Sequence, residues 1–171
     1  MGDVVKKPEL NAVEMIVEIP LGSRFKYEID PASSELWLDR ELFTAMRYPV
    51  NYGFFPRTKG GDGDALDALV LTDDPLVSGC HLWVRPLAVL NVQDQSGDDQ
   101  KVLTLACSDP RYLGVTDITQ LPDHVLAEIR HFFSVYKDLE PGKFSKVGQW
   151  SGSEQALIEV AESQRAYLER A

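Results

Sequence analysis

The stretch Asp62-Gly63-Asp64-Ala65-Leu66-Asp67 places three carboxylates within six residues. In an extended segment the first two would point to one face, whereas Asp67 would point to the other. All three converge only if the backbone bends, and Gly63 permits the φ angles that such a bend requires. Carboxylates crowded in this way repel one another unless cations lie between them. Because the ligands would all be oxygen atoms, the stretch predicts a site for magnesium, manganese or calcium rather than zinc.

Two other interpretations of the same stretch have to be weighed. Asp-Gly-Asp is common in solvated loops, so a plain surface turn remains an alternative on these residues alone. A helix–loop–helix calcium site fits less well. If Asp62 is its first position, Asp67 stands where glycine is needed and Asp73 where a bidentate Glu is expected. The rest of the chain has to decide between a turn and a cation site.

Two further charged clusters are candidates for the same site. Residues 24–30 alternate so that Lys26 and Glu28 share the polar face of a predicted strand. Residues 94–101 form a second acidic cluster at the tip of a predicted hairpin. The alternatives are a solvated strand face for the first cluster and a charged hairpin tip for the second.

Composition limits the classes of protein to consider. The 171 residues carry 27 acidic against 17 basic side chains, a formal net charge of −10. This charge opposes general nucleic-acid binding, which needs a basic surface. No apolar run approaches the roughly 20 residues of a membrane span, and residues 1–10 lack the apolar centre of a signal peptide. Cys80 and Cys107 are too few for a disulfide scaffold and are interpreted as reduced core residues in the cytoplasm, although a single disulfide stays open.

The hydrophobic pattern predicts strands first and helices last, in one domain over residues 1–171. Alternation or short apolar runs predict strands over 13–19, 24–30, 36–40, 68–71, 81–92 and 102–107, with 143–150 a candidate last strand. Residues 47–56, rich in aromatics, Pro and Gly, are expected to be a structured connection. One helix is predicted from about Pro122 to Tyr136, and a capping box of Ser151 and Glu154 is expected to open another that ends near Arg170. The fold class is therefore α+β or mainly β.

With these parts in place, the chain resembles the family I soluble inorganic pyrophosphatases of bacterial type. Each block is weak alone, but their order and spacing over roughly residues 15–150 are specific. The resemblance implies a five-stranded closed β-barrel of oligonucleotide-binding (OB) topology with two main helices packed outside. The blocks that carry it are Glu18-Ile19-Pro20, Lys26 to Asp30, Asp39-Arg40, Tyr48 to Phe54, Asp62 to Asp67, Asp94 to Lys101, and His131 to Phe133 with Tyr136 to Glu140.

The resemblance also implies a reaction, the hydrolysis of pyrophosphate to two orthophosphates at a site with several Mg²⁺ ions, for which Mn²⁺ or other divalent ions could substitute. Asp64 matches the general base, and Asp67 the carboxylate that bridges the activating metal pair. The remaining matched residues are metal ligands (Glu28, Asp62, Asp94, Asp99), phosphate-binding or cavity-lining groups (Lys26, Arg40, Tyr52, Lys101, Tyr136, Lys137) and supports behind the ligands (Glu18, Tyr48).

These residue types suit that reaction. Two metals on one water lower its pKa toward neutrality and so make hydroxide available, while cationic side chains neutralise charge on the leaving phosphate. The six matched carboxylates exceed the four matched cations by two. The cavity would therefore repel pyrophosphate without metals, and strict dependence on divalent cations is expected.

The match has departures and rivals. Ala65 stands where the family usually has proline. Gln95 stands where the family frequently has Glu, and Phe55 stands where it frequently has a smaller residue. A hydrolase of another phosphoanhydride, such as a nucleotide, and a non-catalytic oligonucleotide-binding barrel remain alternatives. The resemblance implies no nucleic-acid or membrane partner and a homo-oligomer, a hexamer in bacterial members, with His131 and Asp138 as candidate contact residues.

Overall fold

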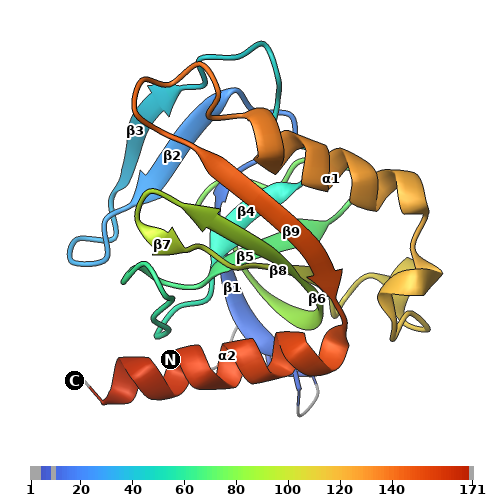
Figure 1. Ribbon diagram of the computed structural model, residues 1–171. Coiled ribbons are helices and arrows are strands. Elements are labelled where there is room, and N and C mark those ends of the chain that lie inside the picture. Colours follow the sequence, from blue (N-terminus) through green and yellow to red (C-terminus); the bar gives the residue numbers. More distant parts are fainter. Residues whose placement is uncertain (1–4, 9–10, 170–171) are drawn as a thin grey trace.

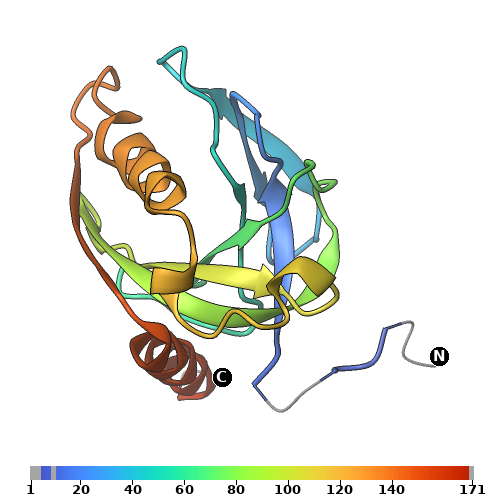
Figure 2. The same ribbon diagram turned by 90° about the vertical axis from the view of Figure 1, so that its right-hand side faces the viewer.

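Five strands form a closed ring in the computed structural model, which describes residues 5–8 and 11–169 (Figure 1, Figure 2). The order around the ring is β1, β4, β5, β8, β6, and it closes because β1 pairs with both β4 and β6. Strands β5 and β8 are parallel, and the other ring pairs are antiparallel. The ring strands are β1 (Val13–Ile19), β4 (Asn51–Phe54), β5 (Asp67–Leu71), β6 (His81–Asp94) and β8 (Lys101–Ala106).

Strand β6 also carries two further strands. The short β7 (Gly97–Asp98) turns back onto its end, and β9 (Ser145–Ser151) pairs along it later in the chain. A separate antiparallel hairpin consists of β2 (Phe25–Ile29) and β3 (Leu36–Glu41). Its large apolar side chains are unusually exposed, with Trp37 at 60% and Leu38 at 56%.

Two helices lie at opposite ends of the ring. In both views α1 (Asp123–Val135) is near the same end as the β2–β3 hairpin, and α2 (Ser153–Leu168) is at the other end (Figure 1, Figure 2). The connection before α1 contains two short 3₁₀ helices, η1 (Pro110–Tyr112) and η2 (Ile118–Gln120). No helix within the described residues has the length and apolar character needed to span a membrane.

The core follows from side chains that alternate along the ring strands. In β5, Leu69 and Leu71 join the cluster that contains Phe132 of α1, whereas Ala68 and Val70 join the cluster that contains Val160 of α2. Successive side chains of a strand point to opposite faces, so each helix is packed on one face of the same strands. This arrangement buries β5 and β8 on both sides and fixes the positions of their first residues, Asp67 and Lys101.

The six strands predicted from alternation or apolar runs are confirmed, as are the last strand and both main helices. The prediction of an irregular connection over 47–56 is wrong, because Asn51–Phe54 pairs with both β1 and β5. Gly53 makes this possible, since a Cβ added there would meet the carbonyl oxygen of Ile16 at 1.9 Å.

Two smaller predictions also need correction. The capping box at Ser151 and Glu154 is wrong, because Ser151 belongs to β9 and Gly152 is the N-cap of α2 without a side-chain hydrogen bond. The expected helix end at Arg170 lies outside the described residues. Cys80 and Cys107 form no disulfide, as predicted, but both are half-buried rather than part of the core.

Candidate active site

The parallel pairing of β5 and β8 places one ammonium group between two candidate metal ligands. Asp67 and Lys101 are register partners at the starts of these strands. The Lys101 Nζ atom lies 2.5 Å from Asp67 Oδ2 and 3.0 Å from Asp99 Oδ1, with only 1% of its side chain exposed. Tyr52 and Phe133 present their rings to the same ammonium at 5.4 and 5.1 Å. When both carboxylates are ionised, they exceed the one cation by one negative charge, which is a charge balance that suits a further cation.

The acidic loop before β5 brings Asp62 to the same place. Asp62, Asp67 and Asp99 all line one narrow crevice. Within the loop, Asp62 Oδ1 accepts a hydrogen bond of 3.1 Å from the amide of Asp64, whose residue is exposed. Gly63 has a φ of +100°, which is the bend that convergence of these carboxylates requires. The structure therefore brings the three carboxylates to one crevice, and the choice between a cation site and a surface turn stays a prediction.

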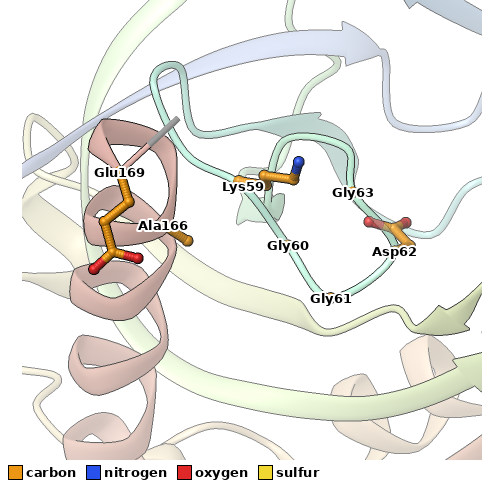
Figure 3. Close-up of a pocket in the computed structure, with 7 residues that line it drawn as sticks. All are labelled: Lys59, Gly60, Gly61, Asp62, Gly63, Ala166 and Glu169. Carbon is orange, nitrogen blue, oxygen red and sulfur yellow. The ribbon is translucent and has the colours of Figure 1, made fainter. Parts of the chain in front are cut away.

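The acidic loop is held in place by hydrogen bonds to helix α2 and to the buried hydroxyl of Thr58. Thr58 Oγ1 donates to the carbonyl of Phe55 at 2.5 Å and accepts from the amide of Leu66 at 2.9 Å, which closes the neck of the loop. The amide of Lys59 donates to the carbonyl of Ser163 in α2 at 2.9 Å. A pocket of about 390 Å³ lies between the loop and the end of α2. Figure 3 shows Asp62 on the loop side of this pocket and Glu169 on the helix side.

A second buried ion pair joins the hairpin tip to the end of α1. The Lys137 Nζ atom lies 2.6 Å from Asp94 Oδ2, and less than a tenth of either side chain is exposed. Tyr136, the C-cap of α1, stacks on Phe132 with ring centroids 5.1 Å apart. Tyr48 and Tyr52 are part of the same aromatic group, 5.6 Å apart. The aromatic core thus positions three tyrosines around the lysines.

The β2–β3 hairpin supplies the remaining cations. Lys26 and Arg40 are register partners across the hairpin. Lys26 forms an ion pair with Glu28 and lies 3.4 Å from Asp39, which also bonds Arg40. Lys26 and Glu28 therefore share one face as predicted, and the face is occupied by charge pairs.

Glu18 joins this hairpin to the ring. Its Oε1 atom accepts a hydrogen bond of 2.8 Å from the amide of Ile29, the neighbour of Glu28. Burial raises the pKa of Glu18 to about 7, and the nearby charge of Asp67 adds to the effect. A metal-free protein near neutral pH therefore holds Glu18 in an environment that favours its neutral form.

Burial perturbs the metal-ligand candidates as well. It raises the pKa of Asp67 to about 7 in spite of the opposing charge of Lys101, and it raises the pKa of Asp62. Burial alone would also raise the pKa of Asp99, but Lys101 and the contact with Asp67 hold that pKa below its usual value. For Tyr52, burial and the charge of Asp67 raise the pKa well above 10. The tyrosine hydroxyl stays protonated and able to donate.

The predicted residues thus fall into three groups that the fold brings to neighbouring elements: the ring carboxylates with Lys101, the Asp94–Lys137 pair, and the hairpin cations. Within the described part of the chain, no three His, Cys, Asp or Glu side chains already form a metal site. The chemistry of the donors still fits magnesium, because half-buried carboxylate oxygens of Asp62, Asp67 and Asp99 line one crevice. In the metal-free arrangement the Lys101 ammonium bridges two of them.

Two residues with direct contacts to the candidate groups were not assigned roles from the sequence. Asp39 contacts both Lys26 and Arg40, and Glu140 accepts two hydrogen bonds from Arg40. The only feature of the sequence that could have identified them is that both residues lie inside blocks that match the family. Arg40 and Glu140 are 100 residues apart, so no local pattern could pair them.

Comparison with known proteins identifies the family to which the chain belongs. The family model for inorganic pyrophosphatase matches residues 15–168. The inorganic pyrophosphatase of Leifsonia xyli subsp. xyli is 45% identical over 147 residues, covering 86% of this chain and 90% of that protein. The inorganic pyrophosphatase of Methanosarcina acetivorans is 44% identical over 162 residues, covering 95% and 96%. The solved structure of inorganic pyrophosphatase from Helicobacter pylori superimposes with a TM-score of 0.91 at 40% identity, covering 97% of this chain and 99% of its own.

Proposed function

Because the chain belongs to the inorganic pyrophosphatase family and is an inorganic diphosphatase, we propose that it hydrolyses pyrophosphate to two orthophosphates at a site for several magnesium ions. The observation that carries this proposal is the cluster of buried Lys101 with half-buried Asp67 and Asp99 beside Asp62. The acidic excess of this cluster suits cations, and the lysines and arginine around it suit an anionic substrate.

Asp62, Asp67 and Asp99 would hold the activating metal pair, with Asp67 as the bridging ligand. Glu28, Asp94 and Asp99 would hold the ions that enter with the substrate, and manganese could substitute for magnesium. When bound, magnesium supplies water of lowered pKa and neutralises phosphate charge. Glu18 and Tyr48 support these ligands from behind, Glu18 through its bond to the hairpin backbone.

The remaining roles belong to side chains that move a proton or grip phosphate. Asp64, exposed beside Asp62, would take the proton of the attacking water. Arg40 can grip one phosphate with two parallel N–H bonds, while Lys26 and Lys137 neutralise charge as it develops. The hydroxyls of Tyr52 and Tyr136 donate without adding charge, and Lys101 lines the same cavity.

The test is phosphate release by wild type, Asp67→Asn and Asp74→Asn. We expect the Asp67 variant to lose several orders of magnitude in kcat, because a neutral amide cannot bridge two cations as a carboxylate does. Asp74→Asn removes an exposed carboxylate beyond the far end of the same strand and should retain near-normal activity. Near-normal activity of the Asp67 variant would remove the bridging assignment.

The same assay tests the metal requirement and the rival substrate. We expect excess EDTA to abolish phosphate release, and magnesium with ATP to give far less release than magnesium with pyrophosphate. Undiminished hydrolysis in EDTA would overturn the proposed mechanism, and equal rates on both substrates would favour a general phosphoanhydride hydrolase.

The ring supports the OB-type barrel that the resemblance implies. In chain order its strands lie first, second, third, fifth and fourth around the ring, and the third and fifth are parallel. This is the strand arrangement of a small closed barrel with Greek-key connections. We also propose that residues 1–171 act as one domain, because both hydrophobic clusters draw on β5, β6 and β8.

Assembly and location are part of the same proposal. The exposed apolar residues Leu36, Trp37 and Leu38 of β3 support a homo-oligomer, a hexamer by resemblance, with exposed His131 and Asp138 as further contact candidates. Cys80 and Cys107, which form no disulfide, support a reducing compartment such as the cytoplasm. The net charge of −10 opposes nucleic acid as a partner.

A further inference from the structure

Glu140 is a buried carboxylate whose two oxygen atoms both have cationic partners. It lies after α1, and only 3% of its side chain is exposed. Its Oε1 atom accepts from Arg40 Nε at 3.1 Å and from Arg40 Nη2 at 3.0 Å, and its Oε2 atom lies 2.9 Å from Lys143 Nζ. Burial alone would raise the pKa of Glu140, but the hydrogen bonds from Lys143 and Arg40 hold it below its usual value. The group is therefore an anion at neutral pH.

The backbone fixes Glu140 to another phosphate-binding candidate. Its amide donates to the carbonyl of Lys137 at 2.9 Å, and its own carbonyl accepts from the amide of Lys143 at 3.2 Å. The two hydrogen bonds from Arg40 to Glu140 join the connection between α1 and β9 to the β2–β3 hairpin. Glu140 thus links two candidate phosphate ligands, Lys137 through its backbone and Arg40 through its side chain.

The contacts of Arg40 leave one part of its guanidinium free. A guanidinium has five N–H donors in a rigid plane. Glu140 takes the Nε–H and one N–H of Nη2, and Asp39 takes one N–H of Nη1. Among the described residues, one donor remains on each terminal nitrogen, and the terminal nitrogens of a guanidinium can bind a phosphate. Glu140 therefore determines which edge of Arg40 can face the substrate.

We propose that Glu140 is a positioning residue, which holds Arg40 by its Nε side so that the terminal N–H groups face a phosphate of the substrate. This inference deepens the proposed function and depends on it. A positioning role and a role in charge balance alone predict opposite changes in phosphate affinity when Glu140 is neutralised. If Glu140 only reduced the positive charge of Arg40, its neutralisation would tighten phosphate binding, whereas loss of positioning weakens it.

The test compares Glu140→Gln with Arg40→Lys and the double variant, using magnesium pyrophosphate for kinetics and inorganic phosphate for calorimetric binding. We expect Glu140→Gln to lower kcat/KM at least tenfold and to weaken phosphate binding, because misplaced contacts of this kind are costly. In the Arg40→Lys background the same substitution should cost less than threefold, since the group it positions is gone.

Glu41→Gln is the matched control, because Glu41 follows Arg40 directly but pairs with Arg24 at 3.2 Å and is half exposed. It should keep activity within twofold of wild type. If Glu140→Gln does not fold, Glu140→Asp is the alternative variant, because it keeps the negative charge but its side chain is one methylene shorter and places the carboxylate farther from Arg40. It should show the same loss and the same dependence on Arg40.

The possible results separate the two proposals. Equal losses from Glu140→Gln in both backgrounds, or tighter phosphate binding by the variant, would overturn the positioning role. A wild-type protein that releases no phosphate from pyrophosphate would instead overturn the proposed function.

Discussion

Two carboxyl groups in this site have pKa values well above those of the same groups in water. Asp67 and Glu18 both have pKa values raised to about 7, chiefly by burial, and the nearby charge of Asp67 contributes to the raised pKa of Glu18. Such perturbed carboxyl groups gather where charge is later supplied by a ligand. Bound cations would stabilise the ionised forms, so the metal-free protein should be the pH-sensitive one.

At this scale Glu18 gives a test of stability against pH. Its folded pKa of about 7 is above the unfolded value of 4.5, so its contribution is fully present below pH 4.5 and is lost as the pH rises to 7. The loss is on the order of 3 kcal/mol from a shift of this size. We expect metal-free Glu18→Gln, which still accepts from Ile29, to lose less stability than wild type between pH 5 and 8.

Urea unfolding in EDTA at several pH values measures this difference. Glu35→Gln, at an exposed carboxylate of the same hairpin, should follow the wild-type profile. Parallel profiles for wild type and Glu18→Gln would show that Glu18 ionises without cost in the folded state.

At the scale of elements, the acidic loop is the part most dependent on its supports. Thr58 closes its neck, α2 holds the amide of Lys59, and Gly63 makes the bend. Ala65 leaves its centre less constrained than the proline usual in the family. The proposed metal ligands on this loop therefore depend on contacts from outside it.

Ala65→Pro should stiffen the loop. Proline reduces the freedom of the unfolded chain, so we expect unfolding free energy to rise by about 0.4–1 kcal/mol and magnesium activation to need a lower concentration. Denaturant unfolding and a magnesium titration of activity measure both effects. Gly63→Ala is the contrasting variant, because its φ of +100° strains any side chain, and it should be destabilised. A destabilised Ala65→Pro would mean that the loop backbone at 65 does not accept proline.

The elements also show what the sequence can and cannot predict. Alternation and helical spacing identified β1, β2 and α1, because one-sided burial leaves a periodic trace. The sequence pattern did not identify β4, because Pro49 and Gly53 suggest a break in regular structure there. There the close approach to β1 decides the structure, and a glycine is needed for it. The carboxylates of the site were predictable by type and by resemblance, but the bond between Arg40 and Glu140 depends on tertiary packing alone.

At the scale of the whole molecule, the β2–β3 hairpin combines site cations with exposed apolar residues. Leu36 is 46% exposed and lies at the end of β3 away from Arg40. If copies of the chain associate through this face, Leu36→Glu should reduce the sedimenting mass by placing a charge in the contact. Leu113→Glu, at a position 64% exposed beside η1, is the control and should not change it. A wild-type protein that sediments as a single chain would contradict self-association.

The parallel pairing of β5 and β8 has a consequence for folding. Asp67 and Lys101 are 34 residues apart in the chain and become neighbours only when these strands align. Contacts between distant segments form slowly, since the loop between them must first lose its freedom. We therefore infer that a partly folded chain lacks the proposed magnesium site, and that refolding chains acquire this arrangement late, when the ring closes.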